Sequence, residues 1–390
     1  MSRPHAAAIV EDSVHEQIER ALRSRGWGNR VVTHIGYGSP SFVRVFARIL
    51  LGRKGREHLE GPESRQDATG ALAPARYDRG WRAFITSPAT GVPVKVTVGD
   101  REVYGRSDRG GHVDIVARDH GLEPGWQQVI VEAQGTSPVP ADVFIVAEDV
   151  RFGLVSDIDD TVIATMLPRP MIAAFNTFVR RGKARHAVAG MAPMYRRVLA
   201  AHPGAPTVYV STGAWNTAAT LNRFLVENGY PLGPLLLTDW GPTNTGWFRS
   251  GQDHKRTCLH RLARDFPDIQ WLLVGDDGQH DPQLYAEFAE ARPDRVDAIC
   301  IRHLSPTEQV LSNIMKLDAP ARTVGPRTVS TFSAPDGHAM LRVLEQNGHV
   351  GPSVAADEQP SRPGRPAPPL PPAATGSADV PGRAGGEGRA

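Results

Sequence analysis

The sequence predicts an α/β domain that follows a small antiparallel β-sandwich domain. In the second half of the chain, three apolar runs have the length of buried parallel strands, and they end abruptly at Asp157, Ser211 and Asp276. Helix-like segments separate these runs, and such alternation is typical of a parallel sheet. In the first half, short alternating runs lie between glycine-rich turns, which favours antiparallel pairing. The 390 residues exceed what one hydrophobic core usually fills, so we expect two folded units with tails.

The chain begins with a predicted amphipathic helix within residues 1–30. Val10, Val14, Ile18 and Leu22 recur at a spacing of four, and charged residues occupy the other faces. The apolar stripe predicts packing against the body of the protein, and membrane association is the alternative. The polar face mixes positive and negative charges, which favours packing.

Residues 31–148 are predicted to form the β-sandwich. Several of their apolar runs alternate with polar residues, as expected for strands with one buried face. The charged, turn-rich segment 53–80 predicts a long surface loop, and no catalytic constellation is evident in this domain. Strands are expected at residues 42–50, 81–85, 94–98, 113–116 and 129–131.

Residues 149–350 are predicted to form the α/β domain, with five strands in a parallel sheet. The carboxyl ends of parallel strands meet at one edge, where open α/β sheets bind ligands. Residues 351–390 are rich in Pro, Ala and Gly, which predicts a disordered tail; a proline-rich ligand at 362–372 is the less favoured alternative. The five strands are expected at residues 152–156, 207–210, 235–237, 271–275 and 298–301.

Composition argues against several classes of function. The formal net charge of +2 disfavours nucleic acid as a partner, because binding a phosphate backbone needs an excess of Lys and Arg. Cys258 and Cys300 form neither a disulfide framework nor a metal clip, so we expect a reducing cytoplasm. The apolar stretch at residues 6–10 is too short for a signal peptide, and no apolar run reaches the ~20 residues of a transmembrane helix. Any contact with a membrane is therefore expected to be peripheral.

The first of the strand ends carries two carboxylates that suit phosphoryl transfer. This reaction needs a nucleophile in line with the leaving oxygen, a proton donor for that oxygen and positive charge around the phosphoryl group. Asp157 is the candidate nucleophile, because a carboxylate can form an aspartyl-phosphate that water later hydrolyses. Asp159 lies two residues further on, so it can face the same side, protonate the leaving group and then deprotonate the attacking water.

The remaining motifs predict a magnesium site beside a phosphate-binding group. Two carboxylates this close repel each other and need a cation, and Asp276 with its neighbours completes an all-oxygen site suited to Mg²⁺. Ser211 can bond a phosphate oxygen, and Lys255 can neutralise the carboxylates and the phosphoenzyme. Each motif alone is more often structural, as a helix cap, a turn or a solvated lysine. Their shared order and strand-end placement make chance a poor explanation.

These motifs resemble the haloacid dehalogenase superfamily, whose members carry Asp-x-Asp-x-Thr, a Ser or Thr, a Lys and a Gly-Asp pair in this order. More closely, the chain resembles the bacterial branch of the actin-patch phosphatidate phosphatase family. The resemblance spans residues 150–316 and implies a Rossmann-like haloacid-dehalogenase domain. Its motifs lie at residues 156–162, 190–195, 209–216, 233–237, 239–242, 254–255 and 275–282.

The resemblance implies roles for residues at the matching positions. The catalytic residues would be Asp157 and Asp159, and the expected phosphate binders are Ser211, Thr212 and Lys255. The expected metal ligands are Asp157, Asp159, Asp276, Asp277 and Asp281. Asp277 stands where the family commonly has Ser, so the carboxylate that contacts the ion directly stays open among the last three.

The family implies phosphatidate as the substrate, which hydrolysis would convert to diacylglycerol and phosphate. The motifs themselves support only phosphomonoester hydrolysis, because a fold does not choose the leaving group. The alternative substrates are a soluble metabolite and a phosphorylated macromolecule, and the non-enzyme alternative is a β-sandwich interaction protein whose second domain only binds. The basic segment 180–186 is expected to be a helix end, a lip that attracts an anionic substrate, or both. The aromatic loop 239–249 is a second candidate rim.

Overall fold

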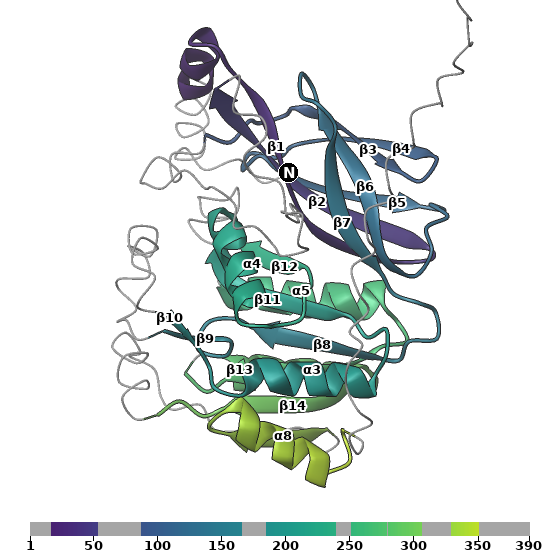
Figure 1. Cartoon of the computed structure of the whole chain (residues 1–390), viewed down its shortest axis with the longest axis vertical. Coiled ribbons are helices and arrows are strands. Elements are labelled where there is room, and N and C mark those ends of the chain that lie inside the picture. The colour runs from purple at the N-terminus through teal and green to yellow at the C-terminus, as the bar shows by residue number, and fades with distance from the viewer. Residues whose placement is uncertain are drawn as a thin grey trace, which may run out of the picture.

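The computed structural model describes residues 17–53, 87–165, 185–238, 251–278, 280–305 and 329–350 (Figure 1). Within these ranges, a curled antiparallel sheet is followed by a parallel sheet with helices on both faces. Residues 17–24 are helical, and Leu22 packs against the core of the first sheet while Ile18 is exposed. In the described ranges, no helix is long and apolar enough to cross a membrane. The predicted tail at 351–390 lies outside the described residues.

The first domain is one seven-stranded sheet in the order β4-β3-β6-β7-β1-β2-β5. Neighbouring strands pair antiparallel, except β1 and β7, which run parallel. The strands are β1 (Trp27–Ser39), β2 (Phe42–Arg53), β3 (Pro93–Val98), β4 (Arg101–Arg106), β5 (His112–Arg118), β6 (Gly125–Ala133) and β7 (Val139–Ile145).

This sheet curls around its own apolar core. The buried side chains of its strands form one hydrophobic cluster. The two edge strands approach each other, because a Cβ added to Gly105 of β4 would lie 2.8 Å from the Ile115 side chain of β5. The predicted sandwich of two sheets is therefore wrong. Alternation shows that one face is buried, but a second sheet and a curled single sheet bury it equally well. The strand predicted at 81–85 lies outside the described residues.

The second domain contains a parallel sheet of six strands in the order β12-β11-β8-β13-β14-β15. All five predicted strands are present, and the sixth, β15 (Ser330–Ala334), was not predicted. Its residues are mostly polar because it lies at the edge of the sheet, so it lacks the apolar run of a central strand. The predicted strands are observed as β8 (Phe152–Asp157), β11 (Thr207–Ala214), β12 (Leu235–Thr238), β13 (Gln270–Asp276) and β14 (Val296–Arg302).

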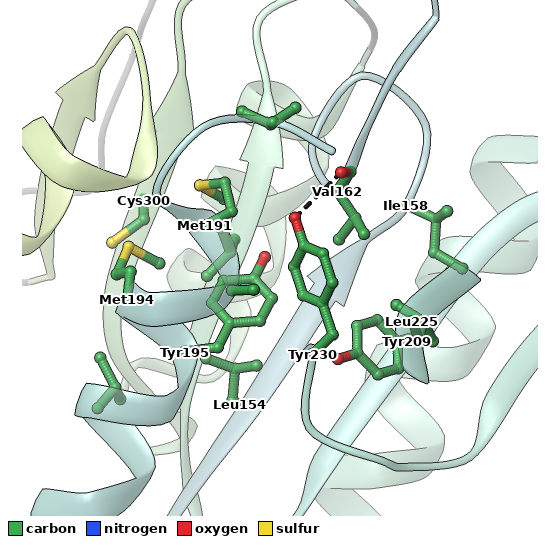
Figure 2. Packing of buried hydrophobic residues seen from close by; sticks show 14 of the residues in the cluster. Leu154, Ile158, Val162, Met191, Met194, Tyr195, Tyr209, Leu225, Tyr230 and Cys300 are labelled. Carbon is green, nitrogen blue, oxygen red and sulfur yellow. Dashed lines mark hydrogen bonds between the residues drawn. The ribbon is translucent and has the colours of Figure 1, made fainter. Parts of the chain in front are cut away.

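Helices cover both faces of the parallel sheet (Figure 1). The helices α3 (Met191–Ala201), α4 (Ala218–Glu227) and α8 (Gly337–Gln346) bury one face, and α5 (Gly251–Asp265) and α6 (Asp281–Ala291) bury the other. Figure 2 shows the first of these cores, in which Tyr195, Tyr209 and Tyr230 pack among aliphatic side chains. The second core also contains Tyr37 and Phe46 of the curled sheet, so the two domains share one apolar interface.

Short elements complete the described chain. A 3-10 turn, η3 (Trp215–Thr217), follows β11, and a second one, η4 (Pro293–Arg295), precedes β14. A small hairpin joins β9 (Ile163–Thr165) to β10 (Arg185–Ala187) in antiparallel register. The basic segment at 180–186 therefore ends in a strand at Arg185 and His186, and its earlier part lies outside the described residues, as does the loop 239–249.

Candidate active site

The strand order of the parallel sheet brings two carboxylates side by side. Counted along the chain, the order is 3-2-1-4-5-6, so the direction of winding reverses between β8 and β13. Open α/β sheets bind ligands at the carboxyl ends of the strands at such a reversal. Asp157 is the last residue of β8 and Asp276 is the last residue of β13. Ser211 follows the last residue of β11 that pairs with β8, so its side chain reaches the same edge.

A buried lysine joins two of the carboxylates. Lys255 of α5 lies 2.7 Å from Asp157 Oδ1 and 2.5 Å from Asp281 Oδ1 through its Nζ. Asp281 is the first residue of α6, where the helix dipole favours a negative charge. Asp157, Asp276 and Asp281 can each offer an oxygen so that the three oxygens lie within 4.8 Å of one another, and all three residues are buried. Three carboxylates against one ammonium leave a net negative site.

Each of these three carboxylates keeps one oxygen free. Lys255 occupies Oδ1 of Asp157 and of Asp281, and the Gly278 backbone N–H donates to Asp276 Oδ1 at 2.7 Å. The Oδ2 atoms of all three aspartates are buried and have no hydrogen-bond partner among the described residues. A buried carboxylate oxygen without a partner is costly, because it has lost its hydration. Three neighbouring carboxylates that each keep an oxygen without a partner provide the kind of ligands that an all-oxygen cation site requires.

Burial and mutual repulsion raise the pKa values of two of these carboxyls. The pKa of Asp157 is raised well above its usual value by burial and by the charges of Asp281 and Asp159, although Lys255 opposes the shift. Burial, then Asp281 and Asp157, raises the pKa of Asp276 in the same way. Burial would lower the pKa of Lys255, but the charges of Asp157 and Asp281 raise it above its usual value. A divalent cation would relieve the repulsion and hold both carboxyls ionised.

A glycine makes room for the cluster. A Cβ added to Gly275 would lie 2.6 Å from Asp281 Oδ2 and 2.9 Å from the ring of Tyr285. Any side chain at this position would push the Asp281 carboxylate out of place. Gly275 is therefore needed so that α6 can bring Asp281 close to the end of β13.

Asp159 is hydrogen-bonded to Ser211, one of the predicted phosphate binders. The Ser211 hydroxyl donates to Asp159 Oδ2 at 3.0 Å and accepts the Gly213 backbone N–H at 2.9 Å. Asp159 is half-buried, unlike the carboxylates of the cluster. The sequence therefore predicted two residues that the structure joins by a hydrogen bond, Asp159 and Ser211. The backbone carbonyl of Thr212, the third predicted phosphate binder, accepts a hydrogen bond from the Thr238 hydroxyl at 2.8 Å.

The backbone between Asp157 and Val162 is held by side chains from other elements. The Ser156 hydroxyl donates its only proton to the Asp157 carbonyl at 2.6 Å. The Tyr195 hydroxyl, 2.6 Å from the Ser156 oxygen, must therefore donate to Ser156. Arg302 of β14 donates to the Asp160 carbonyl at 2.7 Å, and Tyr230 donates to the Val162 carbonyl at 3.1 Å (Figure 2).

These bonds fix a turn that contains an unusual backbone conformation. Asp160 has a φ of 59°, in the left-handed region that residues other than glycine rarely adopt. The roles of Arg302 and Tyr230 were missed in the sequence, because a tie to a backbone carbonyl leaves no motif. The one available signal was Arg302 itself, a charged residue at the end of the apolar run of β14.

Asp277 lies outside the carboxylate cluster. Its Oδ2 is 2.7 Å from His303 Nδ1, and its Oδ1 accepts the Leu304 backbone N–H at 2.9 Å. Both of its oxygens are thus directed to the loop after β14. Among the three adjacent candidates for metal ligation, the structure brings Asp276 and Asp281 together with Asp157 and leaves Asp277 aside.

The parallel-sheet domain matches a known family model. Residues 152–303 match the model described as the catalytic domain of phosphatidate phosphatase APP1. Phosphatidate phosphatase APP1 from Saccharomyces cerevisiae is 28% identical over 151 residues, which are 38% of this chain and 25% of that protein. An uncharacterized protein from Schizosaccharomyces pombe is 28% identical over 158 residues, covering 38% of this chain and 24% of its own length. The chain therefore spans about a quarter of the length of these curated relatives.

A solved structure that aligns with most of the chain has a low TM-score. A carbohydrate acetylesterase from Xanthomonas citri aligns over 69% of this chain and 66% of its own, with 10% identity and a TM-score of 0.25. This TM-score is too low to indicate a shared fold. The segment that matches the family model carries the carboxylate cluster, Ser211 and Lys255.

Proposed function

We propose that this protein is a Mg²⁺-dependent phosphomonoester hydrolase of the haloacid dehalogenase type. The observation that carries the proposal is the set of three free, buried Oδ2 atoms on Asp157, Asp276 and Asp281, next to the Asp159–Ser211 pair. A purely structural site would pair or expose these oxygens, since leaving them buried and charged costs stability.

Asp157, Asp276 and Asp281 would hold the cation through their free oxygens. When bound, Mg²⁺ would supply charge stabilisation for the transferring phosphoryl group and compensate the negative cluster. Oxygen ligands of this kind suit Mg²⁺. Lys255 already neutralises one negative charge of the cluster, so the chain and one divalent ion together would balance its three carboxylates.

The residues of the chain divide the reaction into two displacements. Asp157 attacks phosphorus and forms an aspartyl-phosphate, while Asp159 gives its proton to the oxygen of the departing alcohol. Asp159 then removes a proton from water, the water oxygen attacks the same phosphorus, and phosphate leaves as the Asp157 carboxylate is restored. Ser211 and Lys255 would bind the phosphoryl oxygens in both steps. Thr212, which follows Ser211 within β11, would help to bind the phosphoryl group through its backbone.

Phosphatidate is the substrate that we propose, with diacylglycerol and phosphate as products. Its support is the match of residues 152–303 to the phosphatidate phosphatase catalytic domain. A soluble phosphomonoester is the second candidate, because the described site residues contact only a phosphoryl group and its leaving oxygen. We further propose a cytoplasmic protein that meets its lipid substrate at the membrane surface.

Hydrolysis assays with the purified full chain would test this proposal. The assays would compare phosphatidate vesicles with a soluble aryl phosphate, each with Mg²⁺ and with a chelator, for the wild type and for Asp157→Asn. We expect Mg²⁺-dependent release of phosphate from the vesicles and no detectable turnover by Asp157→Asn, because an amide cannot serve as the nucleophile. Asp268→Asn, at an exposed aspartate, is the matched control and should behave as wild type.

Two outcomes would contradict separate parts of the proposal. Substantial Mg²⁺-dependent activity in Asp157→Asn would exclude the aspartyl-phosphate assignment. Turnover of the aryl phosphate without any release from the vesicles would retain the phosphatase and replace phosphatidate by a soluble substrate.

A further inference from the structure

The curled sheet contacts the second domain next to Ser211. Trp215 of η3 lies among three rings of the first domain. Its ring centroid is 4.8 Å from that of His34, 5.7 Å from that of His112 and 6.2 Å from that of Phe46. Aromatic pairs at these distances attract each other beyond their area of burial. The position of Trp215 is therefore set by the first domain.

Trp215 is joined to Ser211 by a short piece of backbone. The Gly213 N–H donates to the Ser211 hydroxyl, and this hydroxyl donates to Asp159. Gly213 is two residues before Trp215, so a shift of the tryptophan ring would move the donor that orients the hydroxyl. On the other side, the Thr238 hydroxyl bonds the Thr212 carbonyl at 2.8 Å. The end of β11 and the start of η3 are thus held by β12 at one point and by the first domain at another.

The first domain also holds the helix that carries Lys255. At the end of α5, Asp265 accepts a hydrogen bond from the Tyr37 hydroxyl at 2.9 Å and pairs with Arg44 at 3.0 Å. Tyr37 is buried, and the side chains of Arg44 and Asp265 are only 14% and 13% exposed, so water and salt screen this contact little. The curled sheet therefore contacts α5, which carries Lys255, and η3, which directly follows the β11 strand that carries Ser211.

We propose that the curled sheet is a positioning element of the phosphate-binding site, and that Trp215 is the positioning residue through which it orients the Ser211 hydroxyl. The proposal rests on the proposed phosphatase function and assigns a role to the first domain. The apolar part of the contact surface, which includes Tyr37, Phe42 and Phe46, is continuous with the core around α5 and α6. The sheet thereby acts on the reaction without supplying a catalytic residue.

A double-mutant cycle in the full chain tests whether Trp215 acts through Ser211. The variants are Trp215→Leu, Ser211→Ala and the double variant, assayed for kcat and KM on the aryl phosphate with Mg²⁺. We expect Trp215→Leu to lower kcat/KM by about 10- to 100-fold, as small misplacements in active sites do. The double variant should match Ser211→Ala within about twofold, because a hydroxyl that is absent cannot be misplaced.

Further variants separate positioning from folding. Trp215→Phe keeps an aromatic ring against Phe46 and should recover most of the activity. Trp126→Leu removes a tryptophan of the first domain that packs on Phe144, with ring centroids 5.2 Å apart, and should leave kcat/KM unchanged. Circular dichroism and the melting temperature report whether each variant folds. Only folded variants are compared, and Trp215→Phe replaces Trp215→Leu in the comparison if Trp215→Leu does not fold.

The results distinguish failure of this inference from failure of the proposed function. Wild-type kcat/KM in folded Trp215→Leu, or losses that multiply in the double variant, would overturn the role of Trp215. A wild-type chain without any phosphatase activity would instead contradict the proposed function. In that event, the inference is tested by the rise in melting temperature that inorganic phosphate with Mg²⁺ produces: a smaller rise in Trp215→Leu supports it, and an equal rise overturns it.

Discussion

The two sheets of this protein differ in how their buried carboxylates are satisfied. In the curled sheet, the buried Asp142 accepts a hydrogen bond from Gln128 at 2.9 Å. At the edge of the parallel sheet, Asp157 and Asp276 are buried with an oxygen that has no partner among the described residues. A partner within its own sheet satisfies Asp142, whereas we propose that a bound cation satisfies the carboxylates of the second sheet.

This difference separates residues that stabilise the fold from residues that the site needs. A protein retains a destabilising cluster of like charges where binding or catalysis requires it. Substitutions in the curled sheet away from its contact with Trp215 should therefore act on stability, and substitutions at the edge of the parallel sheet should act on activity, with some of them even increasing stability.

After the loss of turnover expected for Asp157→Asn, the largest expected effect lies at Asp159. Asp159→Asn removes the proposed general acid and base and keeps the shape of the side chain, so turnover should fall by about 100- to 10,000-fold. The melting temperature should stay near that of the wild type, because Asp159 is half-buried and outside the carboxylate cluster. Steady-state kinetics over a range of pH would measure this. An unchanged rate across that range would contradict the assigned role.

The converse effect is expected at Ile49 in the core of the curled sheet. Ile49 is fully buried, so Ile49→Ala should lower the free energy of unfolding by about 2 to 5 kcal/mol. Urea unfolding would measure this loss of stability. At urea concentrations below the unfolding transition, kcat should stay within about twofold of the wild-type value, whereas a change of about 1.4 kcal/mol in the activation free energy would change kcat tenfold. A large fall in kcat of the folded variant would show that the two regions are not separable in this way.

The same contrast explains how much of the fold the sequence predicted. Central strands such as β8 and β13 were predicted well, because burial on both faces imposes a continuous apolar run. The edge strand β15 was missed, since an exposed edge permits the polar sequence Ser-Thr-Phe-Ser-Ala. The curling of the first sheet could not be predicted, because it depends on how distant strands meet and leaves no periodic signal.

The site was predicted to a similar extent and for similar reasons. The strand ends located Asp157, Asp159 and Ser211, because the change from apolar to polar residues marks the edge of a parallel sheet. The choice between Asp276 and Asp277 depends on the direction of two successive side chains, which spacing alone does not give. The contact between Trp215 and the first domain is tertiary and had no local signal.

Removing one charge from the carboxylate cluster should stabilise the metal-free protein. In Asp276→Asn the repulsion by Asp157 and Asp281 disappears and the new amide can donate to their free oxygens, so the free energy of unfolding should rise by about 1 to 3 kcal/mol. Mg²⁺ should no longer raise the melting temperature, since a ligand of the ion is lost. Thermal unfolding with a chelator and with Mg²⁺ would measure both changes.

Asp277→Asn is the matched control for this prediction. Its carboxylate is bonded to His303 and Leu304 and lies outside the cluster, so the response to Mg²⁺ should stay as in the wild type. Loss of the Mg²⁺ response in Asp277→Asn, with retention in Asp276→Asn, would reverse the assignment of the ligand.

The smallest expected effect concerns pH and the interface between the two regions. Burial, together with the charges of His112 and Arg48, lowers the pKa of His34 from 6.5 to about 3. Between these two pH values the unfolded chain binds a proton that the folded chain does not, so the free energy of unfolding falls as the pH is lowered through this window, by at most about 1.4 kcal/mol per pH unit.

His34→Gln removes the group that binds this proton, so the loss of stability between pH 7 and pH 5 should be smaller than in the wild type. His260→Gln, at an exposed histidine of α5, should keep the wild-type slope. Equal slopes in the wild type and His34→Gln would mean that His34 takes up its proton as readily in the folded protein as in the unfolded chain, which would contradict the lowered pKa.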